Sequence, residues 1–325
     1  MLKNDAIRPL AKKPGRLRSR VDYSRYGYYF VAPFIIAFCI FQLYSIIFTF
    51  RVSFSNMANW KMDYIFTGIA NYIQLLDFRT AAGQSFWSSL GNTFIIWGFN
   101  FVPQIVLALL LAHWFTSRRM RLHFQGGYKV LIFLPNTITA ATIAVLFYSM
   151  FNYPVAPINT LLHQLGLMAT PYEFYRDVTI SRGIISFIQF WMWYGNTMII
   201  LTAGILGINP ALFEAGMVDG CTSGQMFRKI TLPLLRPILL YNLVTSLIGG
   251  LQMFDIPHLL TQGNPNNTTN TVARFIYNQA FTGTYNFNTA SAASVILLFI
   301  IILLSGLLFF IMKDRSDKQP RRAAK

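Results

Sequence analysis

Six long apolar segments alternate with shorter polar connections along the chain. A helix needs roughly 20 mostly apolar residues to cross a bilayer, because lipid offers no hydrogen-bond partner to an exposed peptide group. The segments that reach this length are Tyr28–Phe50, Ser89–Thr116, Tyr128–Phe151, Gly183–Gly207, Pro237–Ile256 and Ala290–Met312. The pattern predicts an all-α integral membrane protein with six transmembrane helices, in one membrane domain over residues 28–312.

Two short basic tails flank this domain, at residues 1–27 and 313–325. The first tail is followed by an apolar run that is too long for a secretory signal and has no obvious small-residue cleavage site. We therefore expect the first apolar segment to stay in the protein as a membrane span.

Composition supports a membrane environment. Of the 325 residues, 54% are hydrophobic and only 12% are charged, whereas soluble chains are about one quarter charged. The net charge of +16 raises a second possibility, because such a basic balance is also typical of proteins that bind nucleic acid. The positions of the basic residues decide between the two.

The basic residues lie mainly in alternate connections. The two tails and the second–third and fourth–fifth connections hold 21 Lys and Arg when Lys129, at the start of the third span, is counted with them, and the remaining three connections hold 6. The positive-inside rule therefore places both termini in the cytoplasm, and an even number of spans also requires both on one side. No basic face is interleaved with aromatic residues as in a nucleic-acid platform, so we expect lipid headgroups rather than nucleic acid as the partner of this charge.

The sequence carries no recognisable catalytic chemistry. No Gly-rich loop leads into Lys followed by Ser or Thr, so the chain lacks a P-loop and is not expected to hydrolyse ATP by itself. The histidines and cysteines are His113, His123, His163, His258, Cys39 and Cys221. Their spacing fits no metal site or disulfide framework, and we expect neither enzyme activity nor a bound metal.

The connection between the fourth and fifth spans, residues 209–237, has the features of a short helix-turn-helix. Asn209 is a suitable cap and Pro210 fits the first helical turn. Glu214 comes early in this helix, near its positive dipole end, and Gly220 can end it. Seven apolar residues in the connection are too many to leave in water: Leu212, Phe213, Met217, Val218, Met226, Phe227 and Ile230. They must pack on the chain's own spans, on lipid or on another protein.

The spacing within this connection resembles the EAA loop of binding-protein-dependent ABC importer permeases. The matching residues are Glu214, Ala215, Gly216, Asp219, Gly220, Phe227, Ile230, Leu232, Pro233 and Pro237. Two positions depart from the family pattern, since Gly216 stands where a second Ala is usual and Cys221 where Ala is commoner. Both replacements are small, so we expect the function of the loop to survive.

This resemblance implies a fold, a location and a set of partners. The fold is that of type I ABC importer permeases, in a prokaryotic inner or plasma membrane. The loop would be a coupling helix that docks in a cleft on an ATPase subunit, with Glu214, Ala215, Gly216, Asp219, Gly220, Phe227, Ile230 and Pro233 as the coupling residues. The expected partners are two ATPase subunits, a second homologous permease and an extracytoplasmic solute-binding protein. ATP and Mg would bind the ATPase subunits, and this chain would hold no cofactor.

Weaker motifs outside the loop resemble permeases of the carbohydrate-uptake type. They are Trp191 and Gly195, Phe254–Asp255, Leu260–Thr261, Gly263 and Pro265, and Phe281, Ala290, Ala292 and Ala293. Asn264 departs from the usual Gly-Gly-Pro turn of that group. The resemblance favours a sugar or oligosaccharide cargo, and an amino acid, a peptide or glycerol phosphate is the alternative.

Polar and aromatic side chains inside the spans are candidates for cargo contacts, because exposing them to lipid is costly. They are Gln189, Trp193, Asn196, Asn242 and Gln252. The first three share one helical face, at offsets of four and three residues, and an aromatic ring with amides suits a sugar. Hydrogen bonding between helices is an equally good explanation for each of them.

Two other classes of membrane protein remain possible from the residues alone. An ion-coupled secondary transporter would show inverted repeats and charged or broken helices at the midplane, and the sequence shows no sign of these. A structural scaffold would use the apolar cytoplasmic loop only as a platform for a partner.

Overall fold

The structure is a computed structural model that describes residues 24–56, 65–117, 123–154, 156–282 and 285–312. The chain divides into two units, residues 1–48 and 49–325, which are considered separately. Within the described residues the regular structure is helical apart from one two-stranded hairpin, which confirms the predicted all-α class.

The first unit is a helical segment. It contains α1 (Ser24–Ala37), the π-helical turn η1 (Phe38–Leu43) and the start of α2 (Tyr44–Ser53). The candidate membrane span Tyr26–Ser53 begins in this unit and is long enough to cross a membrane. The predicted first span, Tyr28–Phe50, lies inside it.

The second unit opens with a small hairpin and a short helix. Strand β1 (Ser55–Asn56) pairs antiparallel with β2 (Ile65–Phe66), and α3 (Ala70–Leu76) follows. The amide of Asn71 on α3 donates 2.9 Å hydrogen bonds to the carbonyls of Ser53 and Ser55. These bonds satisfy buried backbone oxygens where α2 ends.

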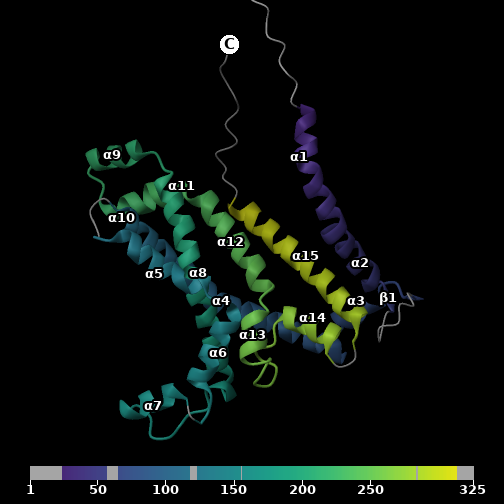
Figure 1. Cartoon of the computed structure of the whole chain (residues 1–325). Coiled ribbons are helices and arrows are strands. Elements are labelled where there is room, and N and C mark those ends of the chain that lie inside the picture. Colours follow the sequence, from purple (N-terminus) through teal and green to yellow (C-terminus); the bar gives the residue numbers. More distant parts are fainter. Residues whose placement is uncertain (1–23, 57–64, 118–122, 155, 283–284, 313–325) are drawn as a thin grey trace, which may run out of the picture. The chain divides into compact units, whose positions relative to one another are not determined.

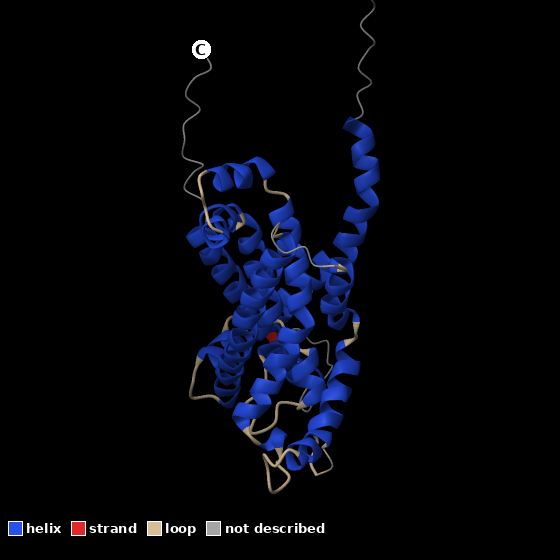
Figure 2. Cartoon of the chain, turned by 90° about the vertical axis from the view of Figure 1, so that its left-hand side faces the viewer, coloured by secondary structure: helices blue, strands red, loops and turns tan. Residues whose placement is uncertain are grey.

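Four long helices form the body of this unit: α4 (Ala81–Thr116), α8 (Val178–Leu206), α12 (Arg236–Leu251) and α15 (Phe287–Met312). In Figure 1, α12 lies between α8 and α15, and in Figure 2 the described chain is almost entirely helix (blue). Helix α4 packs against α8, and α12 packs against both α4 and α15. Each extends a predicted span or lies within a few residues of it.

The third predicted span is not one straight helix, which corrects the expectation of an unbroken segment from Tyr128 to Phe151. Helix α5 (Gln125–Thr137) and helix α6 (Ala140–Phe151) meet at an angle of 88°. Helix α5 ends just after Pro135, and the Thr139 hydroxyl then caps α6 by accepting from the Thr142 amide. Because the helix that follows the break has its own N-cap, the break is a defined part of the fold.

The fifth span is also interrupted. Helix α12 ends at Leu251, residues 252–254 form a turn, and the short helix α13 (Asp255–Leu260) completes the candidate span. The described residues thus contain five candidate spans, or six when α5 and α6 count as one.

The remaining elements lie at the two ends of the second unit. At one end are α9 (Pro210–Val218), α10 (Ser223–Met226), the π-helical turn η3 (Phe227–Thr231) and α11 (Leu232–Leu234). At the other end are α7 (Pro157–Gln164), the 3-10 turn η2 (Phe174–Arg176) and α14 (Val272–Phe281). Helix α9 and helix α7 therefore face opposite sides of a bilayer that the long helices cross.

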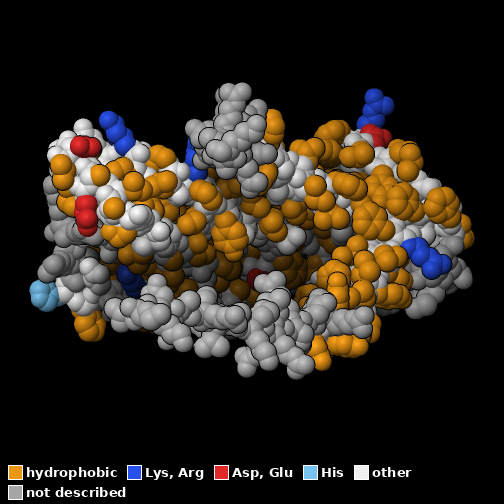
Figure 3. Space-filling view, turned by 90° about the horizontal axis from the view of Figure 1, so that it is seen from above, with side chains coloured by type: hydrophobic (Ala, Val, Ile, Leu, Met, Phe, Trp, Pro, Cys, Tyr) orange, Lys and Arg blue, Asp and Glu red, His pale blue; other side chains and the backbone are white. Residues whose placement is uncertain are grey.

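Hydrophobic side chains fill three clusters between the helices and also cover much of the described surface. The clusters join α6, α8 and α13, then α4, α12, α14 and α15, and lastly α4 and α8 with Leu235. In Figure 3, orange hydrophobic side chains predominate on the face shown, and charged ones are few and scattered. An apolar outer surface is what a lipid environment favours.

Candidate functional site

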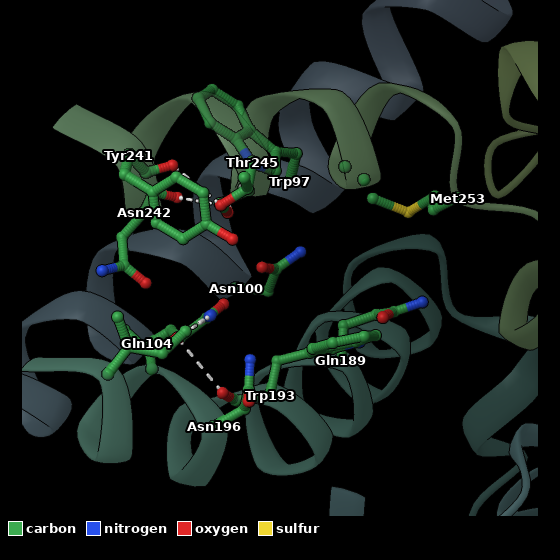
Figure 4. A pocket seen from close by; sticks show the side chains of 15 residues that line it. Trp97, Asn100, Gln104, Gln189, Trp193, Asn196, Tyr241, Asn242, Thr245 and Met253 are labelled. Atoms are coloured by element: carbon green, nitrogen blue, oxygen red, sulfur yellow. Dashed lines mark hydrogen bonds between the residues drawn. The ribbon is translucent and has the colours of Figure 1, made fainter. Parts of the chain in front are cut away.

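Helices α4, α8 and α12 enclose a cavity of about 320 Å³ (Figure 4). Its lining residues are Trp97, Asn100, Gln104, Gln189, Trp193, Asn196, Thr197, Ile200, Tyr241, Asn242, Thr245, Ser246, Gly249, Gly250 and Met253. Polar amides, hydroxyls and three aromatic rings thus meet in the interior of an otherwise apolar helical body.

Four of the five predicted cargo residues line this cavity. Gln189, Trp193 and Asn196 come from one face of α8, and Asn242 comes from α12. The fifth, Gln252, does not, because α12 ends one residue before it and its side chain is exposed at the following turn. Gln252 thus does not line this cavity, and its contact with cargo stays a prediction.

Several polar groups of the cavity have no protein partner. Within the described residues, the amides of Gln189 and Asn196, the indole N–H of Trp193 and the hydroxyl of Tyr241 make no hydrogen bond. The Trp193 side chain is also 47% exposed, although it lies between helices (Figure 4). These donors and acceptors are available to a ligand or to water.

Helix α4 contributes two buried amides that the sequence reasoning missed. The amide of Gln104 donates to the Thr197 hydroxyl at 2.8 Å, and that hydroxyl donates to the carbonyl of Trp193 at 3.2 Å. Asn100 donates to the carbonyl of Ile96 in its own helix. A signal was present, because Trp97, Asn100 and Gln104 follow one another at offsets of three and four residues, as on α8.

Helix α12 brings backbone as well as side chains to the cavity. A Cβ atom on Gly250 would collide with the indole ring of Trp97, so glycine allows that ring to lie against α12. The Trp97 indole N–H donates to the Ser246 hydroxyl at 3.3 Å. Asn242 donates to the Ile238 carbonyl of its own turn, which leaves its oxygen without a partner in the described structure.

The cytoplasmic-loop prediction is confirmed in its local structure. The Asn209 side chain accepts from the Ala211 amide at 3.0 Å, and Pro210 begins α9. At the other end Gly220 has a φ of +73°, and the amides of Gly220 and Cys221 donate to carbonyls of α9. This is a Schellman end, in which glycine supplies the left-handed residue. Glu214 lies in the second turn rather than the first.

The apolar side chains of the loop divide between two environments. Phe213, Met226 and Phe227 line a pocket of about 170 Å³ together with His113 at the end of α4 and residues at the end of α8. The Phe227 ring lies 4.7 Å from the His113 ring, centroid to centroid. The inner face of the loop therefore packs on the chain's own spans.

The exposed part of α9 is also apolar. Val218 is 88% exposed at the end of α9, whereas Leu212 (45% exposed) borders an open groove beside α8 and Met217 (47% exposed) borders the pocket that holds Phe227. Gly216 faces inward, where a Cβ would lie 3.1 Å from the Ile230 side chain. Of the other predicted coupling residues, Glu214, Ala215, Asp219, Gly220 and Pro233 are exposed, and Phe227 and Ile230 are half-buried. The loop thus presents α9 outward and anchors it through η3.

Hydrogen bonds order the loop at the opposite end of the unit. Arg182 of α8 donates to the Asn92 side chain at 2.6 Å and to the carbonyl of Thr268 at 2.9 Å. Arg274 donates to the Asn270 side chain at 2.8 Å, and Gly263 has a φ of +86° beside it. The turn predicted at residues 263–270 is confirmed and is tied to two helices.

Asp177 caps α8 at this end. Its carboxylate accepts from the Ile180 amide at 2.8 Å and from the Tyr172 hydroxyl at 3.2 Å. The backbone hydrogen bond from Ile180 is the main reason that the pKa of Asp177 lies below its usual value, and the Tyr172 hydroxyl adds to it.

Comparison with known proteins identifies the family. Residues 79–322 match the family described as the binding-protein-dependent transport system inner membrane component, and the chain belongs to it. It is 31% identical to the lactose transport system permease protein LacF of Rhizobium radiobacter, covering 91% of this chain and 98% of that one. It is 30% identical to the arabinooligosaccharides transport system permease protein AraP of Bacillus subtilis, over 78% and 77%.

A solved structure shares the fold. It is a bacterial ABC transporter involved in the import of the acidic polysaccharide alginate, with a TM-score of 0.76, 24% identity and coverage of 91% of this chain and 98% of that one. The protein is therefore a multi-pass inner-membrane permease component of an ABC importer. Family membership confirms the predicted class and fold, and it decides against an ion-coupled transporter and against a scaffold. The orientation of the termini stays a prediction.

Proposed function

We propose that this chain forms half of the translocation pathway for a sugar or an oligosaccharide. An extracytoplasmic solute-binding protein delivers the cargo, and ATP hydrolysis on two separate ATPase subunits drives its passage. The observation that carries the cargo proposal is the cavity between α4, α8 and α12, with its unpartnered amides and exposed indole ring. Similarity to permeases named for lactose and arabinooligosaccharide transport supports it.

Sugars suit this cavity for chemical reasons. Each hydroxyl both donates and accepts hydrogen bonds, which matches an amide that offers one of each. The apolar face of a pyranose ring packs on an aromatic ring, and Trp193 presents such a ring to the cavity. The lining thus supplies both kinds of contact within one turn of α8.

A second permease would complete the pathway. An open groove of about 730 Å³ shares Ile200 and Tyr241 with the cavity and includes Ala203 and Gly204 of α8 and Gly207 directly after it. Small residues let helices approach closely within a membrane, so a helix of a homologous permease is the partner that fits this groove.

Energy would enter through α9. Its exposed apolar side chains fit a cleft on an ATPase subunit, and η3 and Gly216 connect it to the spans. Movement of α9 would then rock α8 and α12 around the cavity, as alternating access requires.

The experiment is reconstitution of the complete importer in proteoliposomes. Replacing Glu214 and Gly220 together should remove the ATPase subunits from the purified complex. Trp193→Ala should lower sugar transport at least several-fold and leave assembly intact. Trp114→Ala is the matched control, because Trp114 is also exposed, at 48%, and lines none of the cavities described above. Normal transport by Trp193→Ala, or transport without any ATPase subunit, would contradict the proposal.

A further inference from the structure

The cavity between α4, α8 and α12 is polar but carries no ionisable charge near neutral pH. Among the described residues that line it, none is Asp, Glu, Lys, Arg or His. Its hydrogen-bonding groups are amides, hydroxyls and indole N–H groups. A charge inside a membrane protein is unfavourable unless a group of opposite charge pairs with it.

Two arginines of the described residues, neither of them fully exposed, already donate hydrogen bonds elsewhere. Arg182 holds Asn92 and the Thr268 carbonyl, and Arg274 holds Asn270 and is buried. Neither lines the cavity. A carboxylate or phosphate in the cavity would therefore meet no cation among the described residues that line it.

The free groups of the cavity instead match uncharged hydroxyls. The amides of Gln189 and Asn196 lie seven residues apart on one face of α8, with Trp193 between them, and Tyr241 contributes a hydroxyl from α12. An amide can accept from one sugar hydroxyl and donate to another without leaving a charge unpaired. This arrangement favours the binding of hydroxyls and of the apolar face of a sugar ring, and it disfavours the binding of a carboxylate.

We infer that the cavity selects uncharged saccharides and excludes uronates, sugar phosphates and glycerol phosphate, with Gln189 and Asn196 as specificity-determining residues. The inference rests on the proposed function and narrows its cargo. The inferred cargo of this chain differs in charge from that of the structurally similar importer of the acidic polysaccharide alginate. Such a difference is compatible with a shared fold, because a fold does not fix the charge of a cavity lining.

The test compares neutral and acidic sugars on the complete permease–ATPase complex in nanodiscs, without binding protein. Thermal unfolding is followed while lactose, maltose or trehalose is titrated, and then while the uronic acid counterparts of these sugars are titrated. Ligands that bind the folded state raise the transition temperature according to their affinity. We expect at least ~tenfold weaker binding of each acid, a difference of about 1.4 kcal/mol.

A variant provides the converse experiment. Gln189→Arg places a cation in the cavity and should narrow or reverse the preference for neutral sugars. Gln164→Arg is the matched control, because Gln164 is exposed on α7 and does not line the cavity, so the preference should be unchanged. If the Gln189→Arg complex does not assemble, the comparison of neutral and acidic sugars on the wild-type complex still tests the inference.

The outcomes separate this inference from the proposed function. Acidic sugars that bind the wild-type complex as tightly as neutral ones would overturn the exclusion of charge and leave sugar transport in place. If no saccharide of either kind binds while the ATPase subunits still co-purify, the sugar proposal fails and the inference fails with it.

Discussion

The side-chain amide of Gln104 on α4 donates a 2.8 Å hydrogen bond to the hydroxyl of Thr197 on α8. The same hydroxyl donates to the carbonyl of Trp193, one turn earlier. Both polar side chains are almost fully buried, at 6% and 5% exposure. This chain of bonds ties the turn of α8 that carries Trp193 to α4, and so fixes one wall of the cavity.

Gln104→Leu should weaken cargo transport by about fivefold, because a buried hydrogen bond contributes on the order of 1 kcal/mol. Gln104 acts here as a positioning residue, so Thr197→Val should have a similar effect and the double variant should be no worse than either single one. The measurement is sugar uptake and its apparent KM in proteoliposomes, with complex assembly as the control. Fully additive effects would contradict the link.

Val218→Asp at the end of α9 should reduce co-purification of the ATPase subunits, because a carboxylate would replace an apolar contact in the docking cleft. Leu161→Asp on α7 is the control. Val218 is 88% exposed and Leu161 is also exposed, at 50%, and α7 lies at the other end of the unit. The complex should keep its ATPase subunits in this control.

Equal loss of the ATPase subunits in both Asp variants would point to a general defect in folding. Retention in both would show that the exposed face of α9 is not the docking surface. Only a loss confined to Val218→Asp supports coupling through α9.

Gly220→Ala should loosen the end of α9, because its φ of +73° costs an L-residue about 1 kcal/mol or more. Gly224→Ala is the control: Gly224 lies in α10, its φ is not left-handed, and a Cβ added to it would meet no atom within 4 Å. Hydrogen exchange should speed up at the amides of Gly220 and Cys221 in the first variant alone. Unchanged exchange at both amides would contradict the capping role.

Local sequence patterns were sufficient to predict the spans and the caps of the coupling helix. The spans follow from apolar runs of sufficient length, and the limits of α9 follow from Asn209, Pro210 and Gly220, which act on their immediate neighbours. Such features depend on residues close in the sequence, so a single sequence contains them.

The cavity depended on packing that the sequence pattern does not specify. Gln104 and Tyr241 reach it only because α4 and α12 pack on α8 at a particular rotation. Gln252 does not line the cavity because α12 ends before it, and the third predicted span is broken where Thr139 caps a new helix after Pro135. In each case a tertiary contact or a local break overrode a uniform apolar pattern.

Arg182→Lys should loosen the turn at residues 263–270. The guanidinium holds Asn92 and the Thr268 carbonyl at the same time, and a lysine ammonium cannot reproduce that planar pair of donors. Amides of this turn, such as that of Asn270, should exchange several-fold faster. Arg176→Lys is the control, since Arg176 is exposed and pairs only with Glu173 in the described structure; equal exchange in both variants would contradict the role of Arg182.

The Asp177 carboxylate should make the stability of the complex fall in acid. Its pKa is lower in the folded protein than its ordinary value of about 4, because the Ile180 amide and the Tyr172 hydroxyl donate to the charged form. A carboxyl group with a lowered pKa contributes stability that is present above its unfolded pKa and is lost as the pH falls through its folded pKa. The loss is therefore expected below about pH 4.

Asp177→Asn isolates this contribution, since asparagine keeps an oxygen that can cap α8 but does not titrate. The transition temperature of the variant should fall less steeply than that of the wild type between about pH 4 and pH 3, within the window set by the lowered pKa. Tyr172→Phe removes one donor and should move the wild-type loss to a slightly higher pH, because the folded pKa then lies closer to its ordinary value. Superimposable acid profiles for Asp177→Asn and the wild type would show that other carboxyl groups govern the acid response.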